Sequence, residues 1–246
     1  MEGYETQAGF WDKTAPRVMG DLIGRPSAVE LMGKGRVRRE KILEAGCGTG
    51  YTARMLVGEE AIVSGCDSSR EMLEKAIKEE KDAPGIEYKL ANIISTGYEG
   101  DRFYGVMSIG VLIHNNPSFV NLAYREAFRV LKPQGTMVVS VTHPYLFTSG
   151  SPSMKKGKNW VKHRFLGKEN AGSRVFEEEY YDLNGNKFVS EVWDHSIGFY
   201  LNGAVQAGFK LEEIREPKVE EKHLLHPSWG KEYGYPAFLQ FRMVKK

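Results

Sequence analysis

The chain has 246 residues, 41% of them hydrophobic, which suits a single α/β domain over residues 1–246 with a sizeable core. Its formal net charge of +2 argues against a dedicated nucleic-acid-binding protein. Two cysteines, Cys47 and Cys66, cannot form a secreted disulfide framework, and no Cys/His cluster has the spacing of a metal site. No apolar run is long enough for a signal core or a membrane span, so we expect a cytoplasmic protein without membrane or metal.

Residues 1–40 are predicted to form a helical lead-in of two pieces. The first surrounds Phe10 and Trp11 and lies before Pro16, and the second presents apolar side chains from positions 29, 31 and 32 on one face.

The stretch Ile42–Gly50, with the sequence ILEAGCGTG, organises the rest of the chain. An apolar run leads into an acid, Glu44, and three glycines then follow at alternate positions. This pattern is typical of a buried strand that ends in a glycine-rich turn and continues as a helix. Glycine allows the backbone to approach a ligand closely. The dinucleotide fingerprint G-x-G-x-x-G would require glycine at Tyr51, which disfavours a pyrophosphate site for NAD.

A second apolar run, residues 61–66, ends in Asp67. An acid at the tip of the second strand of such a fold binds ribose hydroxyls, because two carboxylate oxygens suit a diol and repel a phosphate. Together the two stretches resemble the first motifs of the class I S-adenosylmethionine (SAM)-dependent methyltransferases, of the small-molecule type and similar to methyltransferase domain 11. The resemblance covers roughly residues 40–142. It implies SAM as cofactor and an α/β fold with a seven-stranded Rossmann-like sheet of mostly parallel strands and an antiparallel last strand.

The remaining elements follow in the order that this fold requires. A helix is expected over residues 51–56, and its N-terminus suits the carboxylate of the cofactor. Ser68 and Glu71 have the spacing of a capping box for the next helix. Asn116 and Pro117 predict the start of a further helix. Strands are expected at residues 86–90, 104–109, 136–141, 210–214 and 238–243.

The resemblance also implies a cofactor site. Asn92 stands where the family commonly has an acid that pairs with the adenine amino group, and its amide oxygen still accepts a hydrogen bond. The lead-in is expected to be a lid over the cofactor, although its aromatic side chains suit ordinary helix packing equally well. The predicted cofactor-binding residues are Tyr4, Phe10, Trp11, Glu44, Ala45, Gly46, Cys47, Gly48, Gly50, Asp67, Ser68, Met72, Asn92, Ile93, Ile94, Ile109, Gly110, Val111 and His114.

The expected chemistry is an in-line displacement at a sulfonium methyl, for which the protein mainly supplies alignment and exclusion of water. A base is needed only when the acceptor arrives protonated. His114 and His143 are the predicted catalytic residues, because both follow strand tips that face the cofactor. The alternative for each is a loop residue that holds the backbone. His195 is expected to be a helix cap or a pocket wall.

Residues 143–195 are predicted to be an insertion that acts as a cap over the site or as the arm of a homodimer. Asn184-Gly185 lies between two β-like segments and predicts a hairpin. With the lead-in and the loop 215–236, this insertion is expected to enclose a pocket for a small-molecule acceptor. The expected pocket walls are Tyr145, Phe147, Trp193, Tyr200 and Trp229.

Two other functions stay open on the sequence. A basic run, residues 155–164, contains Trp160 and favours an RNA or protein acceptor, since basic and aromatic residues together bind nucleic acids. The run Glu177–Glu179 lies nearby and counters that charge. A non-catalytic SAM-fold binding protein is the other alternative, although such proteins often lose the glycines or the ribose acid.

Overall fold

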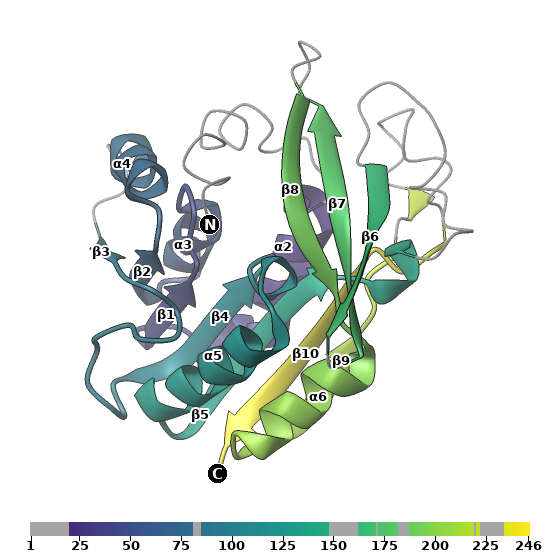
Figure 1. Ribbon diagram of the computed structural model, residues 1–246. Helices are drawn as coiled ribbons and strands as arrows, with labels where there is room; N and C mark the ends of the chain where they lie inside the picture. The colour runs from purple at the N-terminus through teal and green to yellow at the C-terminus, as the bar shows by residue number, and fades with distance from the viewer. Residues whose placement is uncertain are drawn as a thin grey trace.

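The computed structural model describes residues 20–80, 85–147, 162–170, 172–181, 187–218, 220–221 and 234–246. A seven-stranded sheet forms the centre of the fold, and a separate three-stranded sheet rises from one end of it (Figure 1). In spatial order the central strands are β3 Ile86–Leu90, β2 Ile62–Asp67, β1 Lys41–Ala45, β4 Phe103–Ile109, β5 Leu131–Thr142, β10 Phe238–Lys245 and β9 Phe209–Arg215.

The pairing of the central strands confirms the predicted fold. The pairs β1–β2, β1–β4, β2–β3 and β4–β5 are parallel, and β10 runs antiparallel to both β5 and β9. Parallel strands are covered on both faces, which is why Ile42 and Leu43 are both apolar and both buried. The fifth strand begins at Leu131 rather than at residue 136, because Leu131 pairs with Phe103 before a shift in register.

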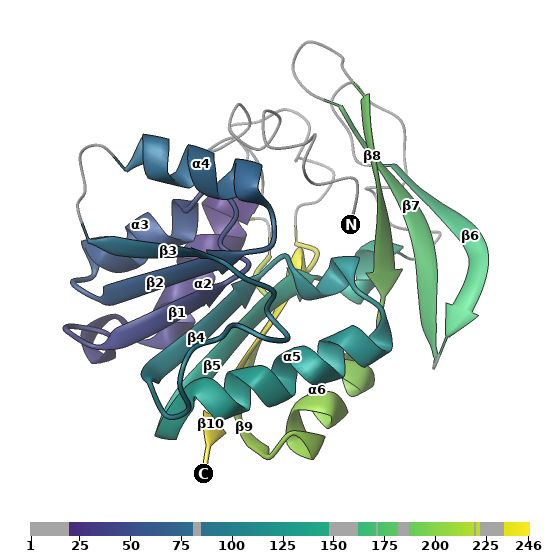
Figure 2. The same ribbon diagram turned by 60° about the vertical axis from the view of Figure 1, so that its left-hand side comes forward.

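Helices cover both faces of the sheet (Figure 2). The helical elements are η2 Gly20–Gly24, α2 Arg25–Met32, η3 Lys34–Arg36, α3 Tyr51–Gly58, α4 Arg70–Glu79, η4 Leu112–His114, α5 Pro117–Val130, η5 Pro144–Phe147 and α6 Ile197–Gln206. The predicted apolar face of the second lead-in helix is buried on α2 at Val29, Leu31 and Met32. The side chains of α2 and α3 join one core cluster, and those of α5 and α6 join a second one. No helix in the described part of the chain is long and apolar enough to cross a membrane.

Side-chain caps set where the helices begin. Asn116 accepts a hydrogen bond from Phe119 N at 3.0 Å and starts α5, as predicted. The start of α4 differs from the capping box expected at Ser68. Its N-cap is Ser69, whose Oγ accepts from Met72 N. The reason is Asp67, whose Oδ1 accepts from Ser69 N at 2.9 Å and turns the chain there.

The insertion forms its own antiparallel sheet of β6 Lys162–Asn170, β7 Ser173–Tyr181 and β8 Lys187–Asp194. The predicted hairpin is confirmed by the pairing of β7 with β8, and the Asn184-Gly185 turn itself lies outside the described residues. The sequence does not predict the remaining strand of this insertion sheet, β6. Its sequence, KHRFLGKEN, is mostly polar and has no alternating apolar pattern, so periodicity does not predict a strand there, and its first three residues belong to the basic run.

Candidate functional site

The glycine-rich turn lies at the carboxyl end of β1 and leads into α3. Gly46 and Cys47 donate backbone hydrogen bonds to the carbonyl of Cys66 at 2.8 and 3.0 Å, which ties the turn to β2. Gly46, Gly48 and Gly50 have φ values of +81°, +53° and +77°, a region that strains any side chain.

The three glycines face different neighbours. A Cβ at Gly46 would collide with the Val111 side chain, and one at Gly50 would collide with the Tyr88 hydroxyl. A Cβ at Gly48 would meet no atom of the described residues within 4 Å. The expectation that Gly46 keeps space free for a ligand is therefore wrong, because the Val111 side chain already fills that space. Among the three glycines of the turn, Gly48 alone has no described neighbour on that side.

Glu44 lies on β1, next to this turn, and is 3% exposed. Its Oε2 has no hydrogen-bond partner among the described residues. Burial raises the pKa of Glu44 to about 7, although a hydrogen bond from Thr52 and the charge of Arg25 oppose the rise. A buried carboxylate oxygen without a partner calls for an explanation, and a ligand that carries a hydrogen-bond donor or a positive charge supplies one.

Arg25 is a site residue that the sequence analysis missed. It begins α2, forms an ion pair with Asp21 and places its guanidinium 5.5 Å from the centroid of the Tyr51 ring. Its charge also reaches Glu44. Nothing in the local sequence marks this arginine, because only the packing of α2 beside α3 brings it to the turn.

Asp67 ends β2 and faces the same turn. Its Oδ2 accepts a hydrogen bond from Gly48 N at 2.8 Å, and its Oδ1 accepts from Ser69 N at 2.9 Å. Burial raises the pKa of Asp67, although these backbone donors oppose the rise. Each oxygen accepts one bond and has a further lone pair for a ligand. Ser68 is exposed and Met72 is buried beside it.

The loop after β3 carries the residues expected at the adenine. Asn92 Oδ1 accepts a hydrogen bond from Ile94 N at 3.1 Å, so the oxygen expected to read adenine already supports the loop. Ile93 is buried and Ile94 is half-buried. Glu126 of α5 holds the far end of the loop, since its Oε1 accepts from Thr96 N and Oγ1 at 2.8 and 2.6 Å.

The segment after β4 brings further predicted residues to the turn. Ile109 ends the strand, Gly110 has a φ of +70° and faces open space, and Val111 packs against Gly46. Ala45 and Cys47, on the other side of the turn, are buried, and burial raises the pKa of the Cys47 thiol. The predicted lid residues Tyr4, Phe10 and Trp11 lie outside the described residues.

His114 and His143 occupy different surroundings. Burial lowers the pKa of His114, although Glu178 and a hydrogen bond to the backbone of Glu191 oppose this. His143 follows β5, and its Nε2 lies 2.9 Å from Glu216 Oε1 while its Nδ1 accepts from Tyr145 N at 3.1 Å. Both ring nitrogens of His143 therefore have protein partners, as in the backbone-holding alternative.

The described residues among the expected pocket walls lie in different surroundings. Phe147 and Tyr200 are buried in hydrophobic clusters, at 3% and 1% exposure, which corrects their assignment as walls. Tyr145 stacks on Tyr235 at 5.3 Å. Trp193 stacks on His195, and Trp229 lies outside the described residues.

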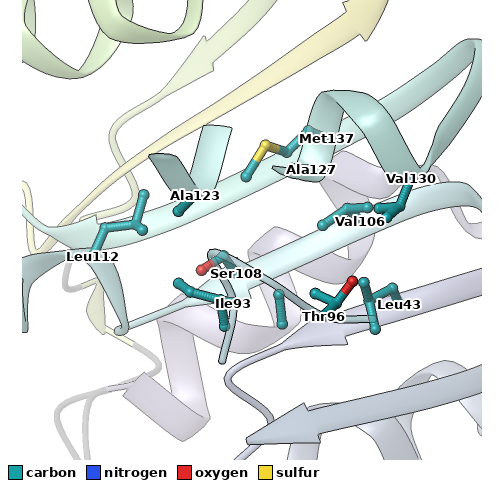
Figure 3. Close-up of a pocket in the computed structure, with 11 residues that line it drawn as sticks. Leu43, Ile93, Thr96, Val106, Ser108, Leu112, Ala123, Ala127, Val130 and Met137 are labelled. Carbon is teal, nitrogen blue, oxygen red and sulfur yellow. The ribbon is translucent and has the colours of Figure 1, made fainter. Parts of the chain in front are cut away.

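A small cavity lies inside the core rather than at this site. Figure 3 shows its lining, which comes from the central sheet, the loop after β3 and α5 and is mostly apolar. The Ser108 hydroxyl has no hydrogen-bond partner within the described part of the chain. The cavity is a gap in the packing between sheet and helix, and nothing in its lining indicates a ligand.

Comparison with known proteins connects this geometry to a family. Residues 42–135 match the family model of the methyltransferase domain. An O-methyltransferase of Penicillium expansum, cnsE, is 26% identical over 148 residues, which are 57% of this chain and 52% of that protein. The chain spans about half or less of the length of the curated relatives it matches.

Solved structures resemble nearly the whole chain. An S-adenosylmethionine-dependent methyltransferase from Mesorhizobium loti aligns with a TM-score of 0.64 at 20% identity, over 89% of this chain and 96% of that one. The 1,6-didemethyltoxoflavin-N1-methyltransferase of Burkholderia thailandensis, solved with 1,6-didemethyltoxoflavin and S-adenosylhomocysteine, aligns with a TM-score of 0.59 at 13% identity, over 100% of this chain and 84% of that one. At such identities the likeness concerns the fold.

Residues 42–135 therefore match a methyltransferase domain, and the described sheet shares the fold of the SAM-dependent methyltransferases named above. The family resemblance predicted from the glycine turn and Asp67 is thereby confirmed.

Proposed function

We propose that the protein transfers a methyl group from SAM to a nucleophilic O, N or C atom of a small-molecule acceptor. The observation that carries the proposal is the pair of acids on neighbouring strands, the buried Glu44 and the half-buried Asp67, beside the open side of Gly48. SAM presents an ammonium and a ribose diol, and these are the groups that an unpartnered carboxylate oxygen and a backbone-held carboxylate bind.

The other described residues fit the remaining parts of SAM. Arg25 and the N-terminus of α3 suit the methionine carboxylate, since both place positive charge near the turn. Asn92 and Ile93 suit the adenine. When bound, SAM supplies a methyl group already activated on a sulfonium.

The chain's own residues then align the acceptor, exclude water and remove a proton where the acceptor carries one. We assign the removal of that proton to His114, which would act as the general base. Burial keeps its pKa below the ordinary value, so the imidazole is neutral near pH 7 and able to accept. His143 and Glu216 connect the tip of β5 to the segment after β9, and we assign them the role of holding these loops.

Two findings support a small-molecule acceptor over RNA. In the register of the insertion sheet, the last positions of the basic run face acids: Lys162 opposes Glu179, His163 opposes Glu178 and Arg164 opposes Glu177. Arg164 and Glu177 form an ion pair at 2.8 Å. The proteins named above include an O-methyltransferase and an N1-methyltransferase solved with 1,6-didemethyltoxoflavin.

Calorimetry tests the cofactor, and a screen tests the acceptor. We expect SAM and S-adenosylhomocysteine to bind and NAD not to bind. Incubation with methyl-labelled SAM and a set of small hydroxy- and amino-substituted heteroaromatic compounds should then label an acceptor. Binding without any transfer, also to RNA and protein, would favour the non-catalytic alternative. A salt-dependent gel shift with RNA would favour the nucleic-acid alternative.

The insertion also remains our proposal for a homodimer contact, because the outer edges of β6 and β8 pair with no described strand. Light scattering after size-exclusion chromatography measures the mass directly. A monomer at all accessible concentrations would remove this proposal and leave the methyl-transfer proposal intact.

A further inference from the structure

His195 connects two parts of the chain that are far apart in the sequence. It lies between β8 and α6 and is 1% exposed. Its Nε2 lies 2.9 Å from the carbonyl oxygen of Asn115, and its Nδ1 lies 2.6 Å from Ser173 Oγ. A carbonyl oxygen only accepts, so Nε2 donates to Asn115, and in the neutral ring Nδ1 accepts from the Ser173 hydroxyl. The imidazole thus joins the insertion sheet to the residue after η4.

The surroundings of His195 fix both its charge and its orientation. Burial lowers the pKa of His195 to about 4, against the hydrogen bond to Asn115, so the ring is neutral at neutral pH. It stacks on Phe199 with ring centroids 4.5 Å apart and on Trp193 at 6.0 Å. Stacking on both neighbours sets the plane of the imidazole and therefore the direction of its two hydrogen bonds.

The turn 111–115 links His195 to the glycine-rich turn. Asn115 Nδ2 donates to Val111 O at 2.8 Å, and His114 N donates to the same oxygen at 3.1 Å. The Val111 side chain in turn fills the space beside Gly46. His114, the proposed base, therefore sits in a turn that touches the glycine-rich turn on one side and His195 on the other.

The insertion sheet reaches the same turn at a second place. Strand β8 packs against η4, and its end lies above the turn that leads into α5 (Figure 2). The backbone of Glu191 on β8 bonds to the His114 ring, and the charge of Glu178 on β7 acts on it. Glu178 is 4% exposed, so this part of β7 is covered by protein.

We propose that His195 is a positioning residue for methyl transfer, which holds the turn 111–115, and His114 with it, between the glycine-rich turn and the insertion sheet. The proposal rests on the methyl-transfer function proposed above. In this arrangement the insertion determines the position of the base. This role does not depend on whether the insertion also encloses the acceptor.

The test uses the full-length chain and three variants. Ser173→Ala removes only the hydroxyl that donates to Nδ1, and His195→Gln removes the ring. Ser108→Ala is the matched control, because it deletes a buried serine hydroxyl on β4 that has no partner in the described part of the chain. Each variant is measured by NMR titration of the His114 ring, assigned through His114→Asn, and by calorimetry with S-adenosylhomocysteine.

The expected result follows from why the pKa of His114 is low. If His195 holds the turn, its loss lets the ring of His114 regain water, and the titration midpoint rises toward the ordinary value by about half a pH unit or more. Glu178 and the Glu191 backbone both raise the pKa of His114, so a loosening of these contacts would lower the midpoint and could not produce the expected rise. We expect Ser108→Ala to match the wild type, and we expect S-adenosylhomocysteine affinity to change by less than about threefold in Ser173→Ala.

Three outcomes decide between the proposals. An unchanged midpoint in folded Ser173→Ala and His195→Gln would overturn the positioning role, even if both variants are less stable. A wild-type ¹⁵N spectrum with the proton of His195 on Nδ1 would overturn it as well, because Nε2 could then not donate to Asn115. Absence of S-adenosylhomocysteine binding to the wild type would instead overturn the proposed function, and the midpoints would still report whether His195 holds the turn.

Discussion

Glu44 gives the sharpest prediction, because its burial links cofactor binding to pH. Its pKa is raised from 4.5 to about 7, and each pKa unit corresponds to about 1.36 kcal/mol. Protonation of Glu44 therefore adds on the order of 3 kcal/mol to the free energy of unfolding of the cofactor-free protein, relative to the ionised form. A carboxyl whose pKa is raised on folding stabilises the protein fully below its unfolded pKa, near 4.5. That stability is lost as the pH rises through about 7.

The variant Glu44→Gln keeps the shape of the side chain and removes the titration. We expect the free energy of unfolding of the wild type, measured by urea denaturation without cofactor, to fall between pH 5 and pH 8 by up to about 3 kcal/mol more than that of the variant. The comparison between the two proteins cancels the contributions of all other titrating groups. Parallel curves for both proteins would refute the assignment of this pH dependence to Glu44.

The same proton should leave when SAM binds. An ammonium favours the ionised carboxylate, so near pH 7 the wild type should release about half a proton for each SAM bound. Calorimetry in two buffers with different ionisation enthalpies measures that number, and Glu44→Gln should release none from this site. Equal proton release by both proteins would show that the ammonium does not meet Glu44.

Three further predictions concern the neighbouring residues. Asp67→Ala should weaken SAM binding by about 1.5–3 kcal/mol in calorimetry, and an unchanged affinity would remove the ribose assignment. Gly48→Ala should lose SAM affinity with a small fall in melting temperature from its positive φ, whereas Gly46→Ala, which adds a collision with Val111, should lower the melting temperature more; the reverse order would contradict the structure. Glu178→Gln should lower the NMR titration midpoint of His114 further, because the carboxylate raises that pKa, and a rise would show that burial rather than charge was changed.

The features that the sequence predicted correctly are those set by local pattern. The apolar run, the acid and the glycines of residues 42–50 each occupy the expected place, because strand, turn and helix follow one another directly there. Asp67 was found for the same reason, since it ends a short apolar strand.

The features that were missed depend on contacts between distant segments. Arg25 reaches the glycine-rich turn only through the packing of α2, and Tyr88 of β3 fills the space beside Gly50 only through the pairing of β3 with β2. Strand β6 was missed because its partner supplies the complementary charge, as in the pair of Arg164 with Glu177. Only the register of the insertion sheet shows that these two charges belong together.

The topology explains why an insertion after the fifth strand acts on a turn after the fourth. Strands β4 and β5 are parallel neighbours, so their carboxyl ends lie side by side, and whatever follows β5 emerges next to the turn 111–115. The chain uses this adjacency through His195, which returns from the insertion to bond Asn115 before α6 begins. The insertion, which we propose to enclose the acceptor, is thereby in contact with the turn that carries the proposed base. On these two proposals, a change in the insertion alters both the binding of the acceptor and the position of the base, and observing His114 directly separates the two effects.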